Sequence, residues 1–372
     1  MGRTVVRRAT VLGSVLVLAL TGLVAGTALD ASAKGFQPGP VGSDEFKGGE
    51  IYRGDFPDPS ILRVGTTYYA YSTTIANKNL PVMTSRDMVT WRAHAPWKAG
   101  EWWNNDGLDK SASWAEYKTI GARRVSPTWA PSVAKVGTRY VHAYATPVRG
   151  ISPRKFCVSV STSAHPGGPF VDRTSRPLVC PSNQGAIDPQ VWVSPGGRRF
   201  LLWKNEGRPG VEATKIWSQR LTTAGTALLP GSSPNLLLET AQPWEGSVIE
   251  NPAIIVYAGR YYLFYSANSW SSDRYAVGYA VCRAARGPCA RPTTVPLLKT
   301  TGTVAGPGGE TPFVGPNGEL RLGYHAWTTG NVGYPPDTTC RSSSAGCAQR
   351  RLHVATLGVN PDDGTLSVTK QG

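Results

Sequence analysis

The chain has 372 residues, which is enough for one large buried core. Its 39 Lys and Arg residues against 24 Asp and Glu residues give a formal net charge of +15. The charge is scattered and no basic helix or aromatic-basic motif is present, so the composition argues against a nucleic-acid-binding module. We interpret the charge as a source of solubility, or of weak attraction to anionic polymers.

The N-terminal segment predicts export from the cell. Arg3, Arg7 and Arg8 precede an apolar run over residues 9–25, and the small-residue sequence Ala31-Ser32-Ala33 follows. This order is typical of a secretory signal peptide, here residues 1–33, although the run is nearly long enough for an uncleaved anchor. We therefore predict a secreted, extracellular protein without stable membrane association. Residues 34–49 are a Gly/Pro-rich, flexible lead-in, and residues 50–372 are expected to form one domain.

The domain contains five copies of one pattern: a short apolar strand, a glycine turn and an aromatic-rich strand. The turn glycines are Gly65, Gly137, Gly197, Gly259 and Gly318, which lie 72, 60, 62 and 59 residues apart. A strand pattern that repeats about every 60 residues is typical of a β-propeller. Further short strands follow each hairpin and would complete four-stranded blades. The sequence therefore predicts an all-β, five-bladed β-propeller.

The six cysteines fall into three close pairs: Cys157 with Cys180, Cys282 with Cys289, and Cys340 with Cys347. In a secreted chain, such pairs predict three local disulfides. Other connectivities stay open, because six cysteines can pair in many ways.

Three of the five copies begin with an acidic residue shortly before a proline: Asp58, Asp188 and Glu250. They precede their turn glycines by 7, 9 and 9 residues, so they lie at the same end of equivalent strands. We therefore expect three carboxylates from three blades to converge at one mouth of the central channel. Two carboxylates facing across a pocket, with a third that tunes one of them, are the equipment of a glycoside hydrolase.

Five segments carry a resemblance to a known family: "FPDPSILRVGTTYYAYST", "NLPVMTSRDMVTW", "TWAPSVAKV", "GAIDPQVWV" and "WEGSVIENPAIIVYAGRYYLFYSAN". Through them the chain resembles glycoside hydrolase family 43, five-bladed propellers that act on arabinose- or xylose-containing polysaccharides. The resemblance implies that Asp58 is the general base, Glu250 the general acid, and Asp188 the carboxylate that orients the acid and modulates its pKa. It also implies inversion, with Asp58 and Glu250 about 6.5 to 9.5 Å apart.

Other acids compete for these roles. Asp55 lies three residues before Asp58, and Glu245 lies five before Glu250. Position and the family pattern favour Asp58 and Glu250. Asn251 departs mildly from the pattern, because relatives commonly have a small residue there. Glu310 occupies the equivalent place in the fifth copy and is kept outside the catalytic set.

Three tryptophans and one histidine are candidate binding residues. Trp102 and Trp103 stand in a polar loop that also contains Trp114, and Trp129 begins the inner strand of the second copy. Each can stack on a sugar face or, alternatively, fill the seam between blades. By the resemblance, His325 in "YHAW" is a candidate ligand of a structural Ca²⁺ ion, although it can equally be a buried core histidine. The mechanism requires no cofactor.

The leading hypothesis is a secreted, monomeric α-L-arabinofuranosidase or exo-arabinanase that acts by inversion on arabinan, arabinoxylan or derived oligosaccharides. β-Xylosidase and endo-1,5-α-L-arabinanase share the three acids and stay open as alternatives. From another class, a non-catalytic carbohydrate-binding propeller would be expected to lose an acid, whereas all three positions are filled. The chain lacks a GxSxG elbow, a phosphate-binding glycine loop and an HExxH helix.

Overall fold

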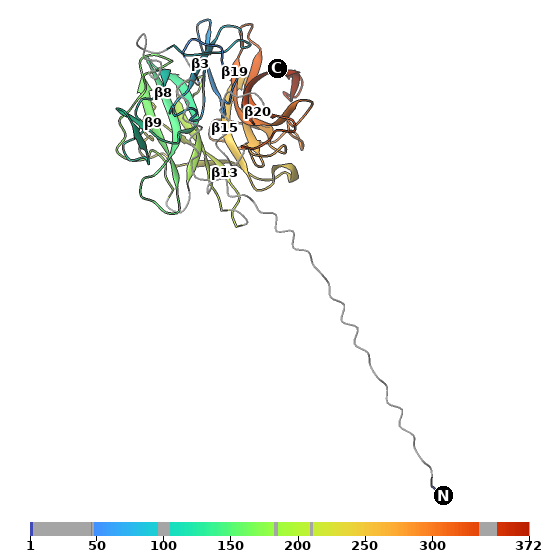
Figure 1. Cartoon of the computed structure of the whole chain (residues 1–372). Coiled ribbons are helices and arrows are strands. Elements are labelled where there is room, and N and C mark those ends of the chain that lie inside the picture. Colours follow the sequence, from blue (N-terminus) through green and yellow to red (C-terminus); the bar gives the residue numbers. More distant parts are fainter. Residues whose placement is uncertain are drawn as a thin grey trace.

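The computed structural model describes residues 1–2, 46, 48–95, 105–181, 185–208, 211–334 and 348–371. These residues form five four-stranded antiparallel sheets, which are the blades of a β-propeller, as predicted (Figure 1). In Figure 1 the colours pass around the molecule from blue to red, so the first blade lies beside the fifth. The predicted fold class is confirmed.

Each blade is built from one continuous stretch of chain. The first contains β1 (Ser60–Val64), β2 (Thr67–Tyr71), β3 (Val82–Ser85) and β4 (Arg92–Ala93). The second contains β7 (Trp129–Val136), β8 (Arg139–Pro147), β9 (Phe156–Ser163) and β10 (Val171–Asp172). The third contains β11 (Ala186–Val193), β12 (Arg199–Asn205), β13 (Lys215–Arg220) and β14 (Asn235–Glu239). The fourth contains β15 (Ile249–Tyr257), β16 (Arg260–Ala267), β17 (Ala276–Cys282) and β18 (Cys289–Ala290). The fifth contains β19 (Val304–Val314), β20 (Leu320–Thr328), β21 (Arg351–Val359) and β22 (Leu366–Gln371).

Two smaller elements lie between the blades in sequence. β5 (Lys118–Ile120) and β6 (Arg123–Val125) form a two-stranded ribbon, and η2 (Pro243–Glu245) is a short 3-10 helix. Among the described residues, no helix has the length and apolar character needed to cross a membrane.

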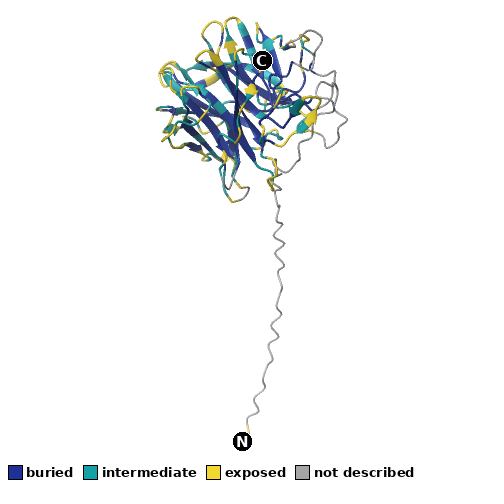
Figure 2. Ribbon diagram, turned by 90° about the vertical axis from the view of Figure 1, so that its left-hand side faces the viewer, coloured by how far each residue is buried: buried dark blue, intermediate teal, exposed yellow. Residues whose placement is uncertain are grey.

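The core lies between the blades, because successive side chains of a strand point to opposite faces of its sheet. On β16, Tyr262 and Phe264 pack against the fifth blade, whereas Leu263 and Tyr265 pack on the other face with residues of the third blade. Full burial of one such side chain stabilises the fold by about 1.5–3 kcal/mol. Figure 2 shows these buried strands in dark blue, with exposed residues mainly at turns.

Two of the three predicted disulfides lie in the described residues, and both are formed: Cys157–Cys180 and Cys282–Cys289. The third predicted pair, Cys340 with Cys347, lies outside the described residues. The bonds each close a short segment within one blade, which agrees with the local pairing expected from the sequence.

Candidate active site

One left-handed residue recurs in every blade, near the start of the innermost strand in the first four blades and inside this strand in the fifth. These residues are Asp58, Ala130, Asp188, Asn251 and Gly309, with φ between 43° and 60°. In the second to fifth blades the ladder register shifts at this point, which marks a β-bulge. In the first four blades a proline follows, and proline fits a bulge because it has no N–H to give to the ladder. The five residues gather at one end of the central channel.

The three predicted acids lie at this end, but their positions are not all equivalent. Asp58 and Asp188 are themselves the left-handed residues, whereas Glu250 stands one residue before Asn251. Asp188 Oδ2 accepts the N–H of Asn251 at 2.9 Å, so the bulge of the fourth blade links Asp188 to the segment that carries Glu250. The charge of Glu250 acts directly on Asp188.

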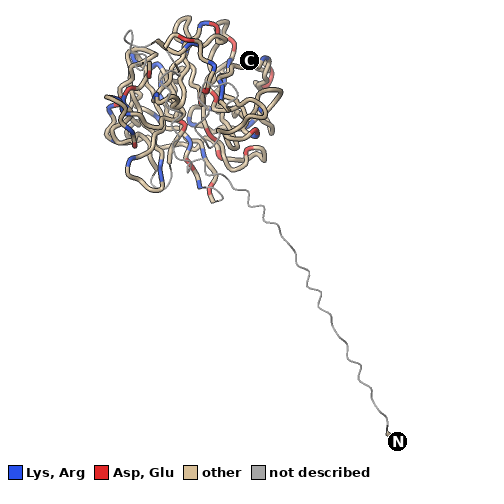
Figure 3. The backbone as a smooth tube through the Cα atoms, viewed as in Figure 1, with Lys and Arg blue, Asp and Glu red and all other residues tan. Residues whose placement is uncertain are grey.

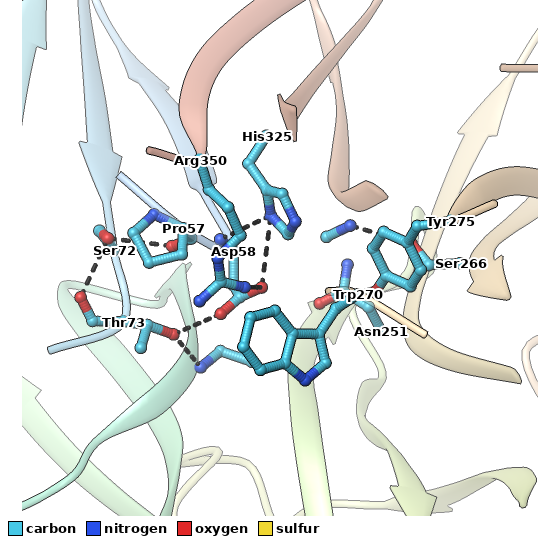
Figure 4. Close-up of polar contacts among 12 residues, drawn as sticks. Pro57, Asp58, Ser72, Thr73, Asn251, Ser266, Trp270, Tyr275, His325 and Arg350 are labelled. Carbon is cyan, nitrogen blue, oxygen red and sulfur yellow. Dashed lines mark hydrogen bonds and ion pairs between the residues drawn. The ribbon is translucent and has the colours of Figure 1, made fainter. Parts of the chain in front are cut away.

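Asp58 is held by donors from two blades, as Figure 4 shows. Its Oδ2 accepts the hydroxyl of Thr73 at 2.6 Å, and its Oδ1 lies 3.2 Å from Nη1 of Arg350. The backbone N–H of Asp58 donates to Nδ1 of His325 at 3.0 Å. The side chain keeps 18% of its surface exposed, so a water molecule can reach the carboxylate.

The side chain of Glu250 is 11% exposed, less than that of Asp58, and both its oxygens are bound. Oε2 lies 2.9 Å from Nζ of Lys204, and Oε1 accepts the hydroxyl of Tyr275 at 2.7 Å. Burial alone would lower the pKa of Lys204, but the carboxylates of Glu206 and Glu250 raise it, so the ammonium stays charged. Glu250 therefore has one cationic and one neutral hydrogen-bond partner.

Asp188 and Glu310 are buried carboxyls with raised pKa values. Burial, followed by the charge of Glu250, raises the pKa of Asp188 well above its ordinary range. Burial likewise raises the pKa of Glu310 to about 8. Glu310 accepts the hydroxyl of Ser266 at Oε2, while Oε1 has no partner among the described residues. Both carboxyls line a channel cavity of about 440 Å³ that Asp58 and Asn251 also border.

The two competing acids have structural contacts instead. Asp55 accepts the N–H of Arg350 at 2.7 Å and the hydroxyl of Tyr334, and burial raises its pKa to about 6. Glu245 is fully buried, where Arg291 and the hydroxyl of Tyr265 bind it. Neither Asp55 nor Glu245 borders the channel cavity, whereas Asp58 does, and Glu250 stands one residue before Asn251, which also borders it. The choice of Asp58 and Glu250 stays a prediction.

Of the three tryptophans predicted to bind sugar, the structure describes only Trp129. Trp102 and Trp103 lie outside the described residues. Trp129 is partly exposed and stacks on Phe156 with ring centroids 3.8 Å apart, so it packs between the second and third blades; a role in sugar binding stays a prediction. Trp114 donates to the hydroxyl of Thr174 in the second blade.

Four residues at the site were not among the sequence candidates: Lys204, Tyr275, Arg350 and Trp270. The guanidinium carbon of Arg350 lies 4.6 Å from the ring centroid of Trp270, and Figure 4 shows both beside Asp58. Lys204 could have been found from the sequence, because a lysine within the apolar strand "FLLWKN" needs an acidic partner if it is buried. Trp270 lies in the loop between β16 and β17, and Arg350 lies directly before β21. In such segments no hydrophobic periodicity predicts where a side chain points.

His325 is fully buried, and its two ring nitrogens differ. Nδ1 accepts the N–H of Asp58, whereas Nε2 has no partner among the described residues. Burial, together with the charge of Arg350, lowers the pKa of His325 well below its ordinary value, so the ring is neutral. A neutral, unpartnered Nε2 fits one position in a metal's ligand sphere. The described residues contain no cluster of three His, Cys, Asp or Glu side chains that would supply the rest.

A five-bladed propeller that gathers differently bound carboxyls at one channel mouth has the site of a glycoside hydrolase. The model of the glycosyl hydrolases family 43 matches residues 50–343, and the chain belongs to this family.

Three relatives with low sequence identity illustrate the similarity. The chain is 22% identical over 292 residues to extracellular endo-alpha-(1->5)-L-arabinanase 1 of Bacillus subtilis (strain 168), covering 75% of this chain and 82% of the relative. A thermostable family-43 glycoside hydrolase matches with a TM-score of 0.65 and 24% identity over 90% of this chain and 96% of the other. Xylan beta-1,4-xylosidase from Bacillus halodurans C-125 also gives 0.65, with 19% identity over 87% of this chain and 56% of the other.

Proposed function

We propose that the protein is an inverting glycosidase in which Asp58 activates water and Glu250 protonates the leaving oxygen. The supporting observation is the difference between the two carboxyls: the Asp58 side chain is the more exposed, at 18%, and contacts Arg350, whereas that of Glu250 is 11% exposed and is held by Lys204 and Tyr275. Inversion needs a base beside water and an acid kept from solvent on the other side of the sugar.

Asp188 supports the acid in this scheme. Burial and the charge of Glu250 raise the pKa of Asp188, so Asp188 can hold a proton at a pH where an exposed carboxyl would lose it. Tyr275 and Lys204 fix the direction of the Glu250 carboxyl, and Arg350 with Thr73 fixes that of Asp58. Asp58 would take a proton from water as the water oxygen bonds to the anomeric carbon, and Glu250 would give its proton to the leaving oxygen as the glycosidic C–O bond breaks.

For the substrate, we propose an arabinose- or xylose-containing polysaccharide or its oligosaccharides, with an α-L-arabinofuranosidase or exo-arabinanase as the leading activity. β-Xylosidase stays an alternative within the family. The name of the Bacillus subtilis relative favours endo-acting arabinanase as the second candidate. The predicted signal peptide, the two disulfides and the extracellular relative support secretion. We also propose that the protein is a monomer.

A calcium ion at His325 is a further part of the proposal. Nε2 would be one ligand and water would supply most others, since calcium prefers oxygen. Such an ion would stabilise the channel and add positive charge near Asp58. Metal analysis of the purified protein before and after chelation tests it.

The deciding experiment is sugar release from chromogenic α-L-arabinofuranosides and β-D-xylosides, linear arabinan and arabinoxylan. Wild type should release sugar, and Glu250→Gln should not, whereas Glu239→Gln, a change at an exposed glutamate, should leave release unchanged. NMR of the first-formed anomer tests inversion. Sugar binding by the wild type without release from any substrate would favour the non-catalytic alternative.

A further inference from the structure

The central channel is polarised along its length. The carboxyls of Asp58, Asp188, Glu250 and Glu310 stand at the left-handed residue of their blade or directly next to it. The channel cavity runs from Asp58 and Glu310 at one mouth to Arg63 and Lys135, which stand near the hairpin turns where the inner strands end. The acids of the channel therefore stand at one mouth, where Lys204 and Arg350 pair with two of them, and basic residues stand at the opposite exit. Basic residues are also spread over the whole fold (Figure 3).

Five basic residues gather at the exit on three neighbouring blades. Arg63 lies near the end of β1, Lys135 and Arg139 flank the turn between β7 and β8, and Arg198 with Arg199 closes the turn between β11 and β12. We name these five residues the channel-exit patch. Four are exposed and Arg199 is partly exposed. β7 contacts both β1 and β11, so the three turns are neighbours.

The positive charge of the channel-exit patch is not neutralised by the described part of the chain. None of its members takes part in an ion pair there. Arg63 and Arg199 donate to the backbone carbonyls of Gly315 and Gly197, which carry no net charge. The turns of the second and third blades at this end, residues 135–139, 163–171, 193–199 and 220–235, contain no Asp or Glu.

The other two blades differ at the same end. Arg321 lies 2.8 Å from Glu319, and Arg260 acts on the carboxylate of Asp363. The arginines at the inner hairpins of these two blades therefore have acidic partners, unlike the members of the channel-exit patch. Exposed cations that lack acidic neighbours repel one another, and a bound polyanion would relieve this repulsion.

We propose that the channel-exit patch binds an acidic polysaccharide, a chain of sugars that carry carboxylate groups. Carboxylates repeated along a flexible chain match separate cations on three adjacent turns, and arginine binds carboxylates in a bidentate manner. A single-stranded nucleic acid is a poorer match, because it needs aromatic platforms for its bases, and the patch turns 63–67, 135–139 and 193–199 contain no aromatic residue.

The position of the patch indicates a role for polysaccharide binding in catalysis, and this role rests on the proposed function. The patch and the acids lie at opposite ends of one channel, so both can be occupied at the same time. An acidic polymer at the exit would hold the enzyme near neutral arabinose- or xylose-containing chains attached to the same material. Binding at the patch raises local concentration without entering the catalytic site.

Immobilised polygalacturonate is the probe that tests the proposal. The wild type should bind it in a salt-sensitive manner, and the triple variant Lys135→Gln, Arg139→Gln, Arg198→Gln should bind roughly tenfold more weakly. The control triple Arg173→Gln, Arg176→Gln, Lys299→Gln removes the same charge at exposed residues elsewhere and should change affinity less than about twofold. Matching circular dichroism melts would show that all three proteins are folded.

Three results would overturn the proposal: no binding by the wild type at low salt, an equal loss in both triples, or tighter binding to single-stranded DNA than to polygalacturonate in the same buffer. Turnover of a small chromogenic arabinofuranoside is measured in the same preparations and should be equal in all three proteins. A wild type that binds polygalacturonate but turns over no substrate would contradict the proposed function and leave the patch proposal supported.

Discussion

Individual carboxyls at the channel mouth differ in what their surroundings do to their protons. Asp58 is partly open and bound to Arg350, whereas Asp188 and Glu310 are buried and their pKa values are raised. The same chemical group can therefore serve as a base in one place and hold a proton in another.

Asp58→Asn tests the base at this scale. The amide keeps the shape of the side chain but cannot accept the proton of water, so kcat should fall about a hundred- to ten-thousand-fold. Affinity for an arabino-oligosaccharide, measured by calorimetry, should stay within about threefold of wild type. Thr73→Val, which removes only the hydroxyl that donates to Asp58, should cost about tenfold or less in kcat. Unchanged kcat in Asp58→Asn would rule out its role as base.

Glu310 predicts a pH dependence of stability. Its folded-state pKa of about 8 lies above the ordinary value of 4.5, so the folded protein holds a proton that the unfolded chain has released in this window. The free energy of unfolding should therefore fall as pH rises from about 4.5 to about 8, by up to about 1.4 kcal/mol per pH unit, and level off above.

Urea denaturation of the wild type and Glu310→Gln at pH values across this window measures the effect. The variant should lose less stability than the wild type as pH rises, whereas the control Glu239→Gln should follow the wild type. Parallel curves for the wild type and Glu310→Gln would contradict the raised pKa.

At the scale of elements, the bulge of the fifth blade is built from glycine for a steric reason. Gly309 has a φ of 60°, and a Cβ there would lie 2.5 Å from Nδ1 of His325 and 2.9 Å from Oδ1 of Asp58. The bulge thus lets the fifth blade approach Asp58 and His325, whose ring accepts the backbone N–H of Asp58.

Gly309→Ala should therefore displace Asp58 and His325 and lower kcat more than tenfold. Gly65→Ala is the matched control, because its φ of 61° is the same but no atom lies within 4 Å of the added Cβ. Both changes carry the left-handed strain of about 1 kcal/mol, so similar melting losses are expected from strain alone. Activity lost equally in both variants would mean that strain, and not contact with Asp58, is the cause.

The elements also show what the sequence could and could not predict. The repeated hairpins predicted the blades because period-two patterns and turn glycines are local signals. The repeats also predicted that Asp58, Asp188 and Glu250 lie at one channel end. They did not predict that Glu250 stands one residue before the left-handed position, because a bulge interrupts the two-residue period of the strand. Arg350 reaches Asp58 across 292 residues of sequence, and no local pattern carries such a contact.

At the scale of the whole molecule, the propeller closes without exchanging a strand. All four strands of the fifth blade come from residues 304–371, and all four of the first come from residues 60–93. The seam between them is joined by the N–H of Phe56, which donates to the carbonyl of Arg350, and by Asp55, which binds Arg350 and Tyr334. The same seam carries the contact between Arg350 and Asp58, so ring closure and the active site share residues.

Asp55→Ala is therefore expected to lower both stability and activity. It leaves the N–H of Arg350 and the hydroxyl of Tyr334 without an acceptor in a buried seam, at a cost of about 3 kcal/mol or more. Asp172→Ala is the control, because Asp172 also accepts buried hydroxyls, those of Tyr144 and Ser159, but within one blade. Thermal melts should show a loss in both variants, whereas kcat/KM measured below the melting range should fall only in Asp55→Ala. Equal kcat/KM in the two variants would mean that the seam holds the ring together without positioning Arg350 against Asp58.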